Sequence, residues 1–349
     1  MARIGIIGTG WGAHVQTPAF REAGLEVVAI AGAQAEKTRK TAAELDLKAF
    51  DDWRKLVTSD VDLITITTPP SEHRAMAIAA LEAGKHVLSE KPTALDAGEV
   101  EEMIAAANAR PNQLALIDHE LRFLPSFLAA RQRLAEDLGA IRYVEARYAS
   151  PGRGDRTRAW NWWSDASHGG GVLGAIGSHL VDTIRYLVGD LDSVQAMLAT
   201  IIGERPFENG QRKVTADDFA SLHARLANGA VATISASVVA SGPDEATSIT
   251  IHGERGAYRL LGEELLFALR GKPFERIAGH DLLEFAGNSA GGAFGSGTIA
   301  LGRALKAAID DGDRSALAPA ATFADGLAQQ RALDAARRSA ANEGRWEKA

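Results

Sequence analysis

A glycine-rich segment near the start of the chain has the residue types and spacing of a phosphate-binding loop. An apolar segment precedes it, a helical pattern follows it, and the segment itself reads Gly8, Thr9, Gly10, Trp11, Gly12 and Ala13. In such a loop Gly8 allows a tight turn, Gly10 lets the backbone approach a pyrophosphate, and Ala13 keeps the helix close to the strand. The helix N-terminus adds amide donors and a partial positive charge. We predict a dinucleotide site here; the alternative is a structural β-α turn without a nucleotide.

The residues that follow the second predicted strand bear on which dinucleotide is bound. A carboxylate about 20 residues beyond the loop would hold the adenosine ribose of NAD, but Gly32 and Ala33 stand in that region and no acid is present. A 2'-phosphate would not be repelled there, and Lys37 or Arg39 could reach one. The cofactor is therefore predicted as NAD or NADP, with a slight lean to NADP. In the alternative interpretation, both basic residues are ordinary solvated charges on a helix.

The first third of the chain alternates short β-branched segments with alanine-rich helical ones, a pattern typical of parallel strands joined by crossover helices. The helices are predicted at 34–45, 71–83 and 96–108, and Ser71 and Asp96 are expected to cap the last two. We therefore expect an α/β Rossmann domain, with a doubly wound parallel sheet, over residues 1–122. Its strands are predicted at 3–8, 26–31, 62–67, 86–89 and 114–118.

Residues 123–349 have longer strand-like segments, and Asn228 and Gly229 stand between two of them as a hairpin signal. We expect an α+β domain with a large, mostly antiparallel sheet. Helices at 299–309 and 322–340 close the chain, and either could pack back on the first domain. Residues 152–154 and 287–295 are predicted as mobile loops. The strands are predicted at 141–148, 193–202, 219–226, 231–239, 248–252 and 258–261.

The composition excludes several kinds of protein. The 349 residues carry a net charge of -7 and no basic patch, which argues against nucleic-acid binding. The chain has no cysteine, so disulfides and thiolate catalysis are excluded, and no metal site is predicted. No apolar run is long enough to cross a membrane and the N-terminus has no secretory signal, so we expect a cytoplasmic protein that makes no membrane contact.

Further motifs follow one another in the order found in a single enzyme family. The motifs are Thr67-Thr68-Pro69-Pro70 with His73, Ser89-Glu90-Lys91-Pro92, Arg122-Phe123-Leu124-Pro125, Gly169-Gly170-Gly171, and Gly177-Ser178-His179 with Asp182. Together they resemble, over essentially the whole chain, the glucose-fructose oxidoreductase and inositol dehydrogenase family, Gfo/Idh/MocA.

Members of this family are two-domain oxidoreductases that act mostly on sugars, polyols or related diols with NAD or NADP. The resemblance implies that the turn from Thr67 to Pro70 runs along the cofactor, near His73, and that Glu90 and Lys91 lie beside the nicotinamide ribose. It also implies that the second-domain helix carries the proton-transfer group. A carbohydrate-like substrate and a homodimer or homotetramer are expected on the same ground.

Lys91 and His179 are the residues that we expect to carry the chemistry. Oxidising an alcohol removes a hydride and a proton, so the site needs a group that titrates near neutrality, as histidine does. The ammonium of Lys91, at the end of a strand, would stabilise developing alkoxide charge on the substrate oxygen. The alternatives are a helix histidine packed between domains and a surface lysine after a strand.

One position departs from the family pattern. Many family dehydrogenases carry an aspartate four residues before the histidine, and here that position is Ala175. A carboxylate there would raise the basicity of the histidine. Its absence leaves His179 to act with Lys91 alone, or leaves Asp165 or His168 to supply the missing group.

Substrate contacts are predicted for His119, Arg122, Trp162 and Asp182. Sugars stack their apolar faces on aromatic rings, and Trp162 belongs to a tryptophan-rich segment; the alternative is a hydrophobic anchor for a long connection. Asp182 shares a helix face with His179, so it would either orient the imidazole or form a structural ion pair.

Three functions therefore compete. The leading hypothesis is an NAD(P)-dependent oxidoreductase that transfers a hydride to or from a sugar, polyol or related substrate. The second is a regulatory protein that binds the cofactor without turnover. The third is an enzyme that uses bound NAD for elimination or glycoside cleavage, without net reduction of the cofactor.

Overall fold

Two compact units share the chain, and each draws on more than one stretch of the sequence. The computed structural model describes residues 1–243, 247–278 and 292–349. The first unit takes Met1–Ala94, Gly98–Leu124 and the described part of 281–326. The second takes Leu95–Ala97, the described part of 125–280, and Leu327–Ala349. The helix near residue 300 therefore belongs to the first unit and the last helix to the second.

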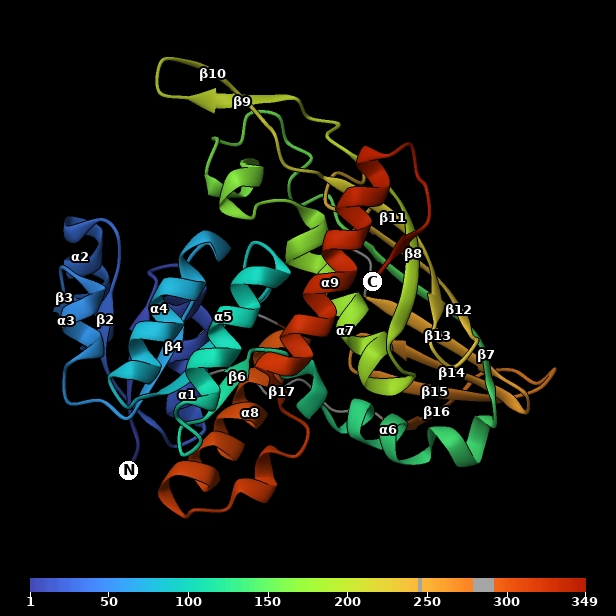
Figure 1. Cartoon of the computed structure of the whole chain (residues 1–349), viewed down its shortest axis with the longest axis horizontal. Coiled ribbons are helices and arrows are strands. Elements are labelled where there is room, and N and C mark those ends of the chain that lie inside the picture. Colours follow the sequence, from blue (N-terminus) through green and yellow to red (C-terminus); the bar gives the residue numbers. More distant parts are fainter. Residues whose placement is uncertain (244–246, 279–291) are drawn as a thin grey trace. The chain divides into compact units, whose positions relative to one another are not determined.

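Within its described residues, the first unit has a seven-stranded sheet in the order β17-β6-β5-β4-β1-β2-β3 (Figure 1). Its strands pair in parallel except β17, which runs antiparallel to β6. The doubly wound parallel sheet is confirmed, and the short strands β3 and β17 were not predicted. The strands are β1 Arg3–Ile7, β2 Glu26–Ala31, β3 Lys48–Phe50, β4 Leu63–Ile66, β5 His86–Ser89, β6 Ala115–Ile117 and β17 Ala321–Thr322.

The three helices predicted before residue 122 correspond to α2, α4 and α5, with an error in one helix cap. Ser71 does not cap its helix, because α4 begins at Pro70 and Pro69 occupies the N-cap position without a side-chain hydrogen bond. Proline fits there because its fixed φ suits a first helical residue, which needs no N–H donor. The helices are η1 Gly12–Gln16, α1 Thr17–Glu22, α2 Ala35–Leu45, α3 Trp53–Val57, α4 Pro70–Glu82, α5 Ala97–Asn108, η2 Glu120–Phe123, α8 Ala293–Asp310 and η6 Arg314–Leu317.

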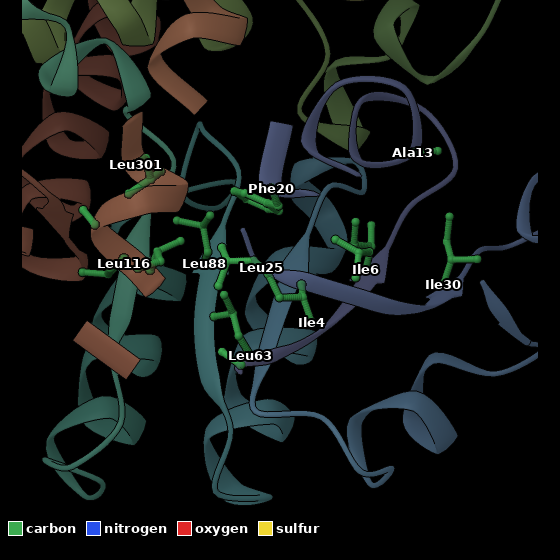
Figure 2. Close-up of a cluster of buried hydrophobic side chains, with 14 of the residues drawn as sticks. Ile4, Ile6, Ala13, Phe20, Leu25, Ile30, Leu63, Leu88, Leu116 and Leu301 are labelled. Atoms are coloured by element: carbon green, nitrogen blue, oxygen red, sulfur yellow. The ribbon is translucent and has the colours of Figure 1, made fainter. Parts of the chain in front are cut away.

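A buried apolar cluster joins one face of this sheet to helices from both ends of the sequence. Figure 2 shows Ile4 of β1 and Leu88 of β5 on the sheet, with Phe20 of α1 and Leu301 of α8 packed near them. The helices α1 and α8 pack closely because Gly302 has no side chain: a Cβ there would lie 2.8 Å from the Ala23 Cβ and 3.0 Å from the Phe20 ring. The sheet core thus depends on a helix about 300 residues from the N-terminus.

The second unit contains a nine-stranded sheet in the order β16-β15-β14-β13-β7-β12-β11-β8-β18, counted over its described residues. The pairing is antiparallel except between β12 and β7, so the predicted mostly antiparallel sheet is confirmed. The hairpin at Asn228 and Gly229 joins β11 to β12 as predicted. The strands are β7 Ile141–Ala149, β8 Leu191–Ala199, β11 Phe219–Leu226, β12 Val231–Ser237, β13 Ser248–Gly253, β14 Gly256–Leu261, β15 Glu264–Leu269, β16 Glu275–Ala278 and β18 Glu347–Lys348.

Helices α7 and α9 lie on one side of this sheet in Figure 1. A separate hairpin, β9 Glu204–Phe207 with β10 Gly210–Lys213, was not predicted. Residues 152–154 lie between β7 and η3 outside regular structure. Of the other predicted loop, 287–291 lies outside the described residues, and Ala293 already begins α8. The helices are α6 Pro125–Leu138, η3 Trp162–Ser164, η4 Ala166–His168, η5 Leu173–Gly177, α7 Ser178–Leu187 and α9 Phe323–Ala341, whose first residues belong to the first unit.

Over the described residues, none of the helices combines the length and the apolar character that crossing a lipid bilayer would require.

Candidate functional site

A row of backbone hydrogen bonds aligns the ends of four strands in the first unit. Gly8 N–H donates to the Ala31 carbonyl at 2.8 Å, and Thr67 N–H donates to the Ile7 carbonyl at 2.8 Å. Along the same edge, Glu90 N–H donates to the carbonyl of Ile66 at 2.9 Å and Asp118 N–H to that of Ser89 at 2.8 Å. The residue that follows each of β1, β4, β5 and β6 is therefore held at one edge. Ligands of open α/β sheets bind at this carboxyl edge.

The glycines of the predicted phosphate loop have three distinct surroundings. Gly8 has φ +132°, and a Cβ there would clash with the Thr67 hydroxyl and lie 2.6 Å from the Thr67 carbonyl oxygen. A Cβ at Gly12 would lie 2.6 Å from the Ile6 side chain. Gly10, in contrast, faces open space, because a Cβ there would have no protein atom within 4 Å. Gly8 and Gly12 are thus required by packing, whereas Gly10 leaves room for a ligand against the backbone, as a pyrophosphate needs.

The rest of the loop leads into a π-helical turn. Thr9 and Trp11 flank Gly10, and η1 then begins at Gly12. Ala13 is completely buried, as expected for the residue that brings the helix against the strand. The wider π turn ends at Gln16, whose side chain is also completely buried. Single π turns are frequent at functional sites, and this one brings Gln16 to the acidic side chains of the sheet edge.

The end of β2 lies against the phosphate loop. A Cβ at Gly32 would lie 2.7 Å from the Thr9 methyl group, so Gly32 lies beside the loop as the motif requires. The next residues, Ala33 and Gln34, are exposed and carry no charge. Lys37, in the first turns of α2, is exposed as well. Residues 32–34 therefore offer no carboxylate, and the first turn of α2 that follows carries the ammonium group of Lys37 beside the carboxylate of Glu36.

His73 connects two of the strand-end turns. It is completely buried in α4, with Nε2 2.9 Å from the Thr68 carbonyl oxygen and Nδ1 3.2 Å from that of Pro92. Burial lowers the pKa of His73, and a neutral imidazole donates from one nitrogen only. The described contacts of His73 hold the turn at Thr67–Pro70 to the turn that carries Lys91.

Three buried carboxyl groups at this edge lie within electrostatic reach of Lys91. Glu90 is 9% exposed, Asp118 is fully buried and Glu120 is 2% exposed. Gln16 Nε2 donates to Asp118 Oδ2 at 2.7 Å and to Glu90 Oε1 at 3.3 Å, while Lys91 N–H donates to Glu90 Oε2 at 3.2 Å. We call Glu90, Asp118 and Glu120 the carboxyl cluster.

The carboxyl cluster has strongly displaced acidities. Burial, with the nearby Asp118 carboxylate, raises the pKa of Glu90 to about 8. Burial raises the pKa of Asp118 to about 6 and that of Glu120 well above its usual value. Perturbed carboxyl groups of this kind are common at functional sites. Sequence reasoning missed Asp118 and Gln16; the signal for Asp118 was its place directly after a strand that neighbours the one before Glu90.

Two predicted substrate residues lie just beyond this cluster. His119 is 2% exposed and precedes η2. Arg122 is 4% exposed, and its Nη2 lies 3.3 Å from Asp325 Oδ1 while Nη1 lies 3.5 Å from the Pro319 carbonyl oxygen. These contacts tie Arg122 to the segment around β17 within the same unit. A substrate contact by either residue stays a prediction.

In the second unit, a short π turn leads into the helix that carries His179. The Asp217 carboxylate accepts the N–H of Leu173 at 2.7 Å, and the Asp217 carbonyl accepts that of Val172 at 2.9 Å. Gly171, at φ +111°, fits beside this carboxylate because a Cβ there would lie 2.5 Å from Asp217 Oδ2. Asp217 therefore fixes the start of η5, which contains Ala175 and continues into α7.

The first turns of α7 contain both predicted helix residues. His179 is 5% exposed and Asp182 is 3% exposed. The carbonyl of Ser178 accepts a hydrogen bond of 2.7 Å from Gln329 Nε2 of α9. His179 therefore lies in a helix that is fixed at its beginning by Asp217 and along its first turn by α9, which is what a proton-transfer group needs to keep a constant position.

Trp162 lies in a loop whose conformation is stabilised by polar contacts. Asn161 caps the short helix η3 through a hydrogen bond from Trp163 N–H at 3.1 Å, and Trp162 is partly buried. Asp165 accepts from the Ser167 hydroxyl at 2.7 Å and lies 3.5 Å from the His168 ring. The hydrogen bond from Ser167 is the main cause that lowers the pKa of Asp165. Asp165 and His168 thus contact one another within this loop.

Comparison with known proteins identifies the family. A family model described as an oxidoreductase family with an NAD-binding Rossmann fold matches residues 2–117, and a GFO/IDH/MocA C-terminal domain model matches residues 127–259. An uncharacterized oxidoreductase of Synechocystis is 34% identical over 269 residues, which cover 75% of this chain and 72% of the relative. The chain belongs to the Gfo/Idh/MocA oxidoreductase family.

Other members of the Gfo/Idh/MocA family match nearly the whole chain. Glucose-fructose oxidoreductase domain-containing protein 2 of Bos taurus is 30% identical over 99% of this chain and 92% of its own length. The solved structure of levoglucosan dehydrogenase in complex with NADH and L-sorbose has a TM-score of 0.87 and 27% identity, and the match covers 99% of this chain and 98% of that one. The family predicted from the motifs is confirmed, and with it an NAD-binding oxidoreductase.

The open surroundings of Gly10 give a test of the cofactor loop. Gly10→Ala should weaken NADH binding at least about tenfold without lowering the melting temperature, because the added methyl group meets no protein atom but enters the space for the pyrophosphate. NADH fluorescence titration and thermal unfolding would measure both. Gly210→Ala, also at an open position, is the matched control and should bind NADH normally. Unchanged affinity in Gly10→Ala would contradict the assignment.

Proposed function

We propose that this protein is an NAD(P)-dependent dehydrogenase or reductase that acts on the hydroxyl or carbonyl group of a sugar, polyol or related substrate. The observation that carries the proposal is the alignment of Lys91 with the phosphate loop along one sheet edge. Gly8 and Glu90 end strands of the same hydrogen-bonded row, and Lys91 is the next residue after Glu90. Levoglucosan dehydrogenase, which has the same fold, is found with NADH and with levoglucosan or L-sorbose.

The proposed chemistry divides between two side chains. The nicotinamide of a bound cofactor would supply the hydride acceptor or donor. Lys91 polarises the substrate oxygen through its ammonium group and stabilises the negative charge that develops there. His179 takes the hydroxyl proton during oxidation and returns it during reduction. Because position 175 is an alanine, no carboxylate one helical turn before His179 assists this proton transfer.

Replacement of His179 tests this division of roles once a substrate is found. Sugars and polyols would be screened with NAD and NADP by the absorbance of the reduced nicotinamide. His179→Ala should then lower kcat at least about 100-fold and leave NADH affinity unchanged, since its role is proton transfer. A comparable loss of kcat in His168→Ala, and not in His179→Ala, would instead assign proton transfer to His168 in the loop. Tight cofactor binding without turnover would favour a regulatory protein, and product without net reduction would favour elimination or glycoside cleavage.

The proposal includes a preference for NADP over NAD. Gly32 and Ala33 provide no carboxylate that would repel a 2'-phosphate, and Lys37 is exposed on the helix that follows. Lys37 would then donate to the phosphate through a charge-assisted hydrogen bond.

Lys37→Ala tests the cofactor preference. It should raise the Kd of NADPH at least roughly tenfold, since a hydrogen bond between charged groups contributes about 1.5–3 kcal/mol, and it should leave the Kd of NADH nearly unchanged. Lys40→Ala, on the same helix near Glu44, is the matched control. Equal effects of Lys37→Ala on the two cofactors would argue for NAD and against a phosphate contact.

A homodimer or homotetramer is proposed on the basis of the nine-stranded sheet. Cross-strand pairing places Ala196, Leu222 and Ile234 in one buried row, so their neighbours Met197 and Ser221 face the other way. Met197 is 59% exposed there. An apolar side chain on an open sheet face is suited to cover by a second copy. We keep the cytoplasmic location as a prediction.

Light scattering would measure the oligomeric state directly. The expected mass is two or four times that of the 349-residue chain, and Met197→Glu should shift the population toward monomer because a charge would then be buried in the interface. A monomer at micromolar concentration in the unaltered protein would refute this part of the proposal.

A further inference from the structure

The carboxyl cluster around Lys91 is not explained by cofactor binding alone. Glu90 and Asp118 follow adjacent parallel strands whose last residues, Ser89 and Ile117, pair in register, so the two carboxyl groups lie side by side. The two carboxyl groups also accept hydrogen bonds from the same side-chain amide, since Gln16 Nε2 lies 2.7 Å from Asp118 Oδ2 and 3.3 Å from Glu90 Oε1. The electrostatic influence of Lys91 extends to Glu90, Asp118 and also Glu120.

The cluster is closed to solvent and incompletely neutralised. Asp118 Oδ1, Glu120 Oε2 and Gln16 Oε1 are buried and have no hydrogen-bond partner among the described residues. Full ionisation would set three negative charges against the one positive charge of Lys91 in a region of low dielectric constant. Ionising two neighbouring buried carboxyl groups costs much free energy, because both charges are desolvated and repel each other, so the groups share a proton instead.

Among the described residues, the elements packed around Glu90 bring no positive charge to it besides that of Lys91. The π turn η1 contributes only the uncharged amide of Gln16. Helix α8 contributes Gly297, where a Cβ would lie 2.7 Å from the Glu120 carbonyl oxygen. Arg122 is directed to Asp325, within its own ion pair. The remaining titratable groups at this edge are Lys91, Asp118, His119, Glu120 and His73.

We propose that Asp118 and Glu120 are positioning residues for Lys91, and that with Glu90 they form a proton-sharing cluster that keeps one net carboxylate charge beside the ammonium at neutral pH. One carboxylate holds the ammonium at the sheet edge, and the protonated partners avoid the repulsion that a second charge would exert on developing alkoxide. The role of Lys91 rests on the proposed function; proton sharing in the cluster does not.

The pH dependence of folding tests the cluster without any substrate. Burial keeps Glu90 protonated up to about pH 8 in the folded protein, whereas the unfolded chain loses this proton near pH 4.5. Since the folded state then binds more protons, the free energy of unfolding should fall as pH rises through this window, and the part of the fall that Glu90 causes should end at about pH 8. Glu90→Gln cannot titrate, so its stability should fall less across the same window.

Asp118→Asn tests whether the neighbouring carboxyl group, in addition to burial, raises the pKa of Glu90. Removing the neighbouring charge should lower the pKa of Glu90 by at least about one unit, so the fall in stability should end at a correspondingly lower pH. Urea unfolding of the cofactor-free full chain, repeated from pH 4.5 to 9, would measure both variants. Glu82→Gln, at an exposed position outside the cluster, is the matched control and should follow the unaltered protein. Curves for Asp118→Asn that level off at the same pH as the unaltered protein would overturn the proposal.

The pH profile of kcat tests the link to Lys91. Alcohol oxidation should decline above about pH 8 as Glu90 ionises, Asp118→Asn should move this decline to lower pH, and Glu90→Gln should remove it. A purely structural role would lower kcat at every pH without moving the decline, and that result would overturn the positioning role. Absence of turnover on every substrate would refute the proposed function, while the unfolding curves would still decide whether the cluster shares a proton.

Discussion

The register of the parallel sheet is the constraint on which the rest of the first unit depends. The four backbone hydrogen bonds from Gly8, Thr67, Glu90 and Asp118 bring the ends of β1, β4, β5 and β6 to one edge. A shift of one residue in any strand would turn its terminal side chain to the opposite face. The phosphate loop, the proline turn held by His73, the lysine and the carboxyl cluster therefore form one site because the strands end together.

Both units use glycine to bring backbone and polar groups closer than a side chain allows. In the first unit, Gly8 and Gly12 let the loop approach Thr67 and Ile6. In the second, Gly171 lets Asp217 receive the first amides of the turn that leads to His179. In each case a helical segment starts at a fixed place and carries a polar side chain a few residues later, Gln16 in the first unit and His179 in the second. The place of each side chain therefore depends on where its helical segment begins.

The doubly wound parallel sheet, the phosphate loop and the family could be predicted from the sequence, because strand pattern and glycine spacing are local signals. The sequence was not sufficient for Asp118 and Gln16. Their roles depend on the register between β5 and β6 and on a π turn at 12–16, and neither is encoded by spacing along one helix or strand. Ser71 was misassigned because proline competes for the start of a helix. The hairpin 204–213 lacks the alternating apolar pattern of a core strand, since every residue of β10 is exposed.

The late return of the chain to its first sheet has a consequence for how the protein is made. Leu301 of α8 enters the core beneath β1 and β5, and β17 adds to the β6 edge at residues 321–322. Domains usually fold in order as the ribosome releases them, but this Rossmann unit lacks part of its core until more than nine-tenths of the chain has been synthesised. A polypeptide ending near residue 122 would leave an apolar face and a sheet edge uncovered, so the cofactor unit cannot be separated from its neighbour by a single cut.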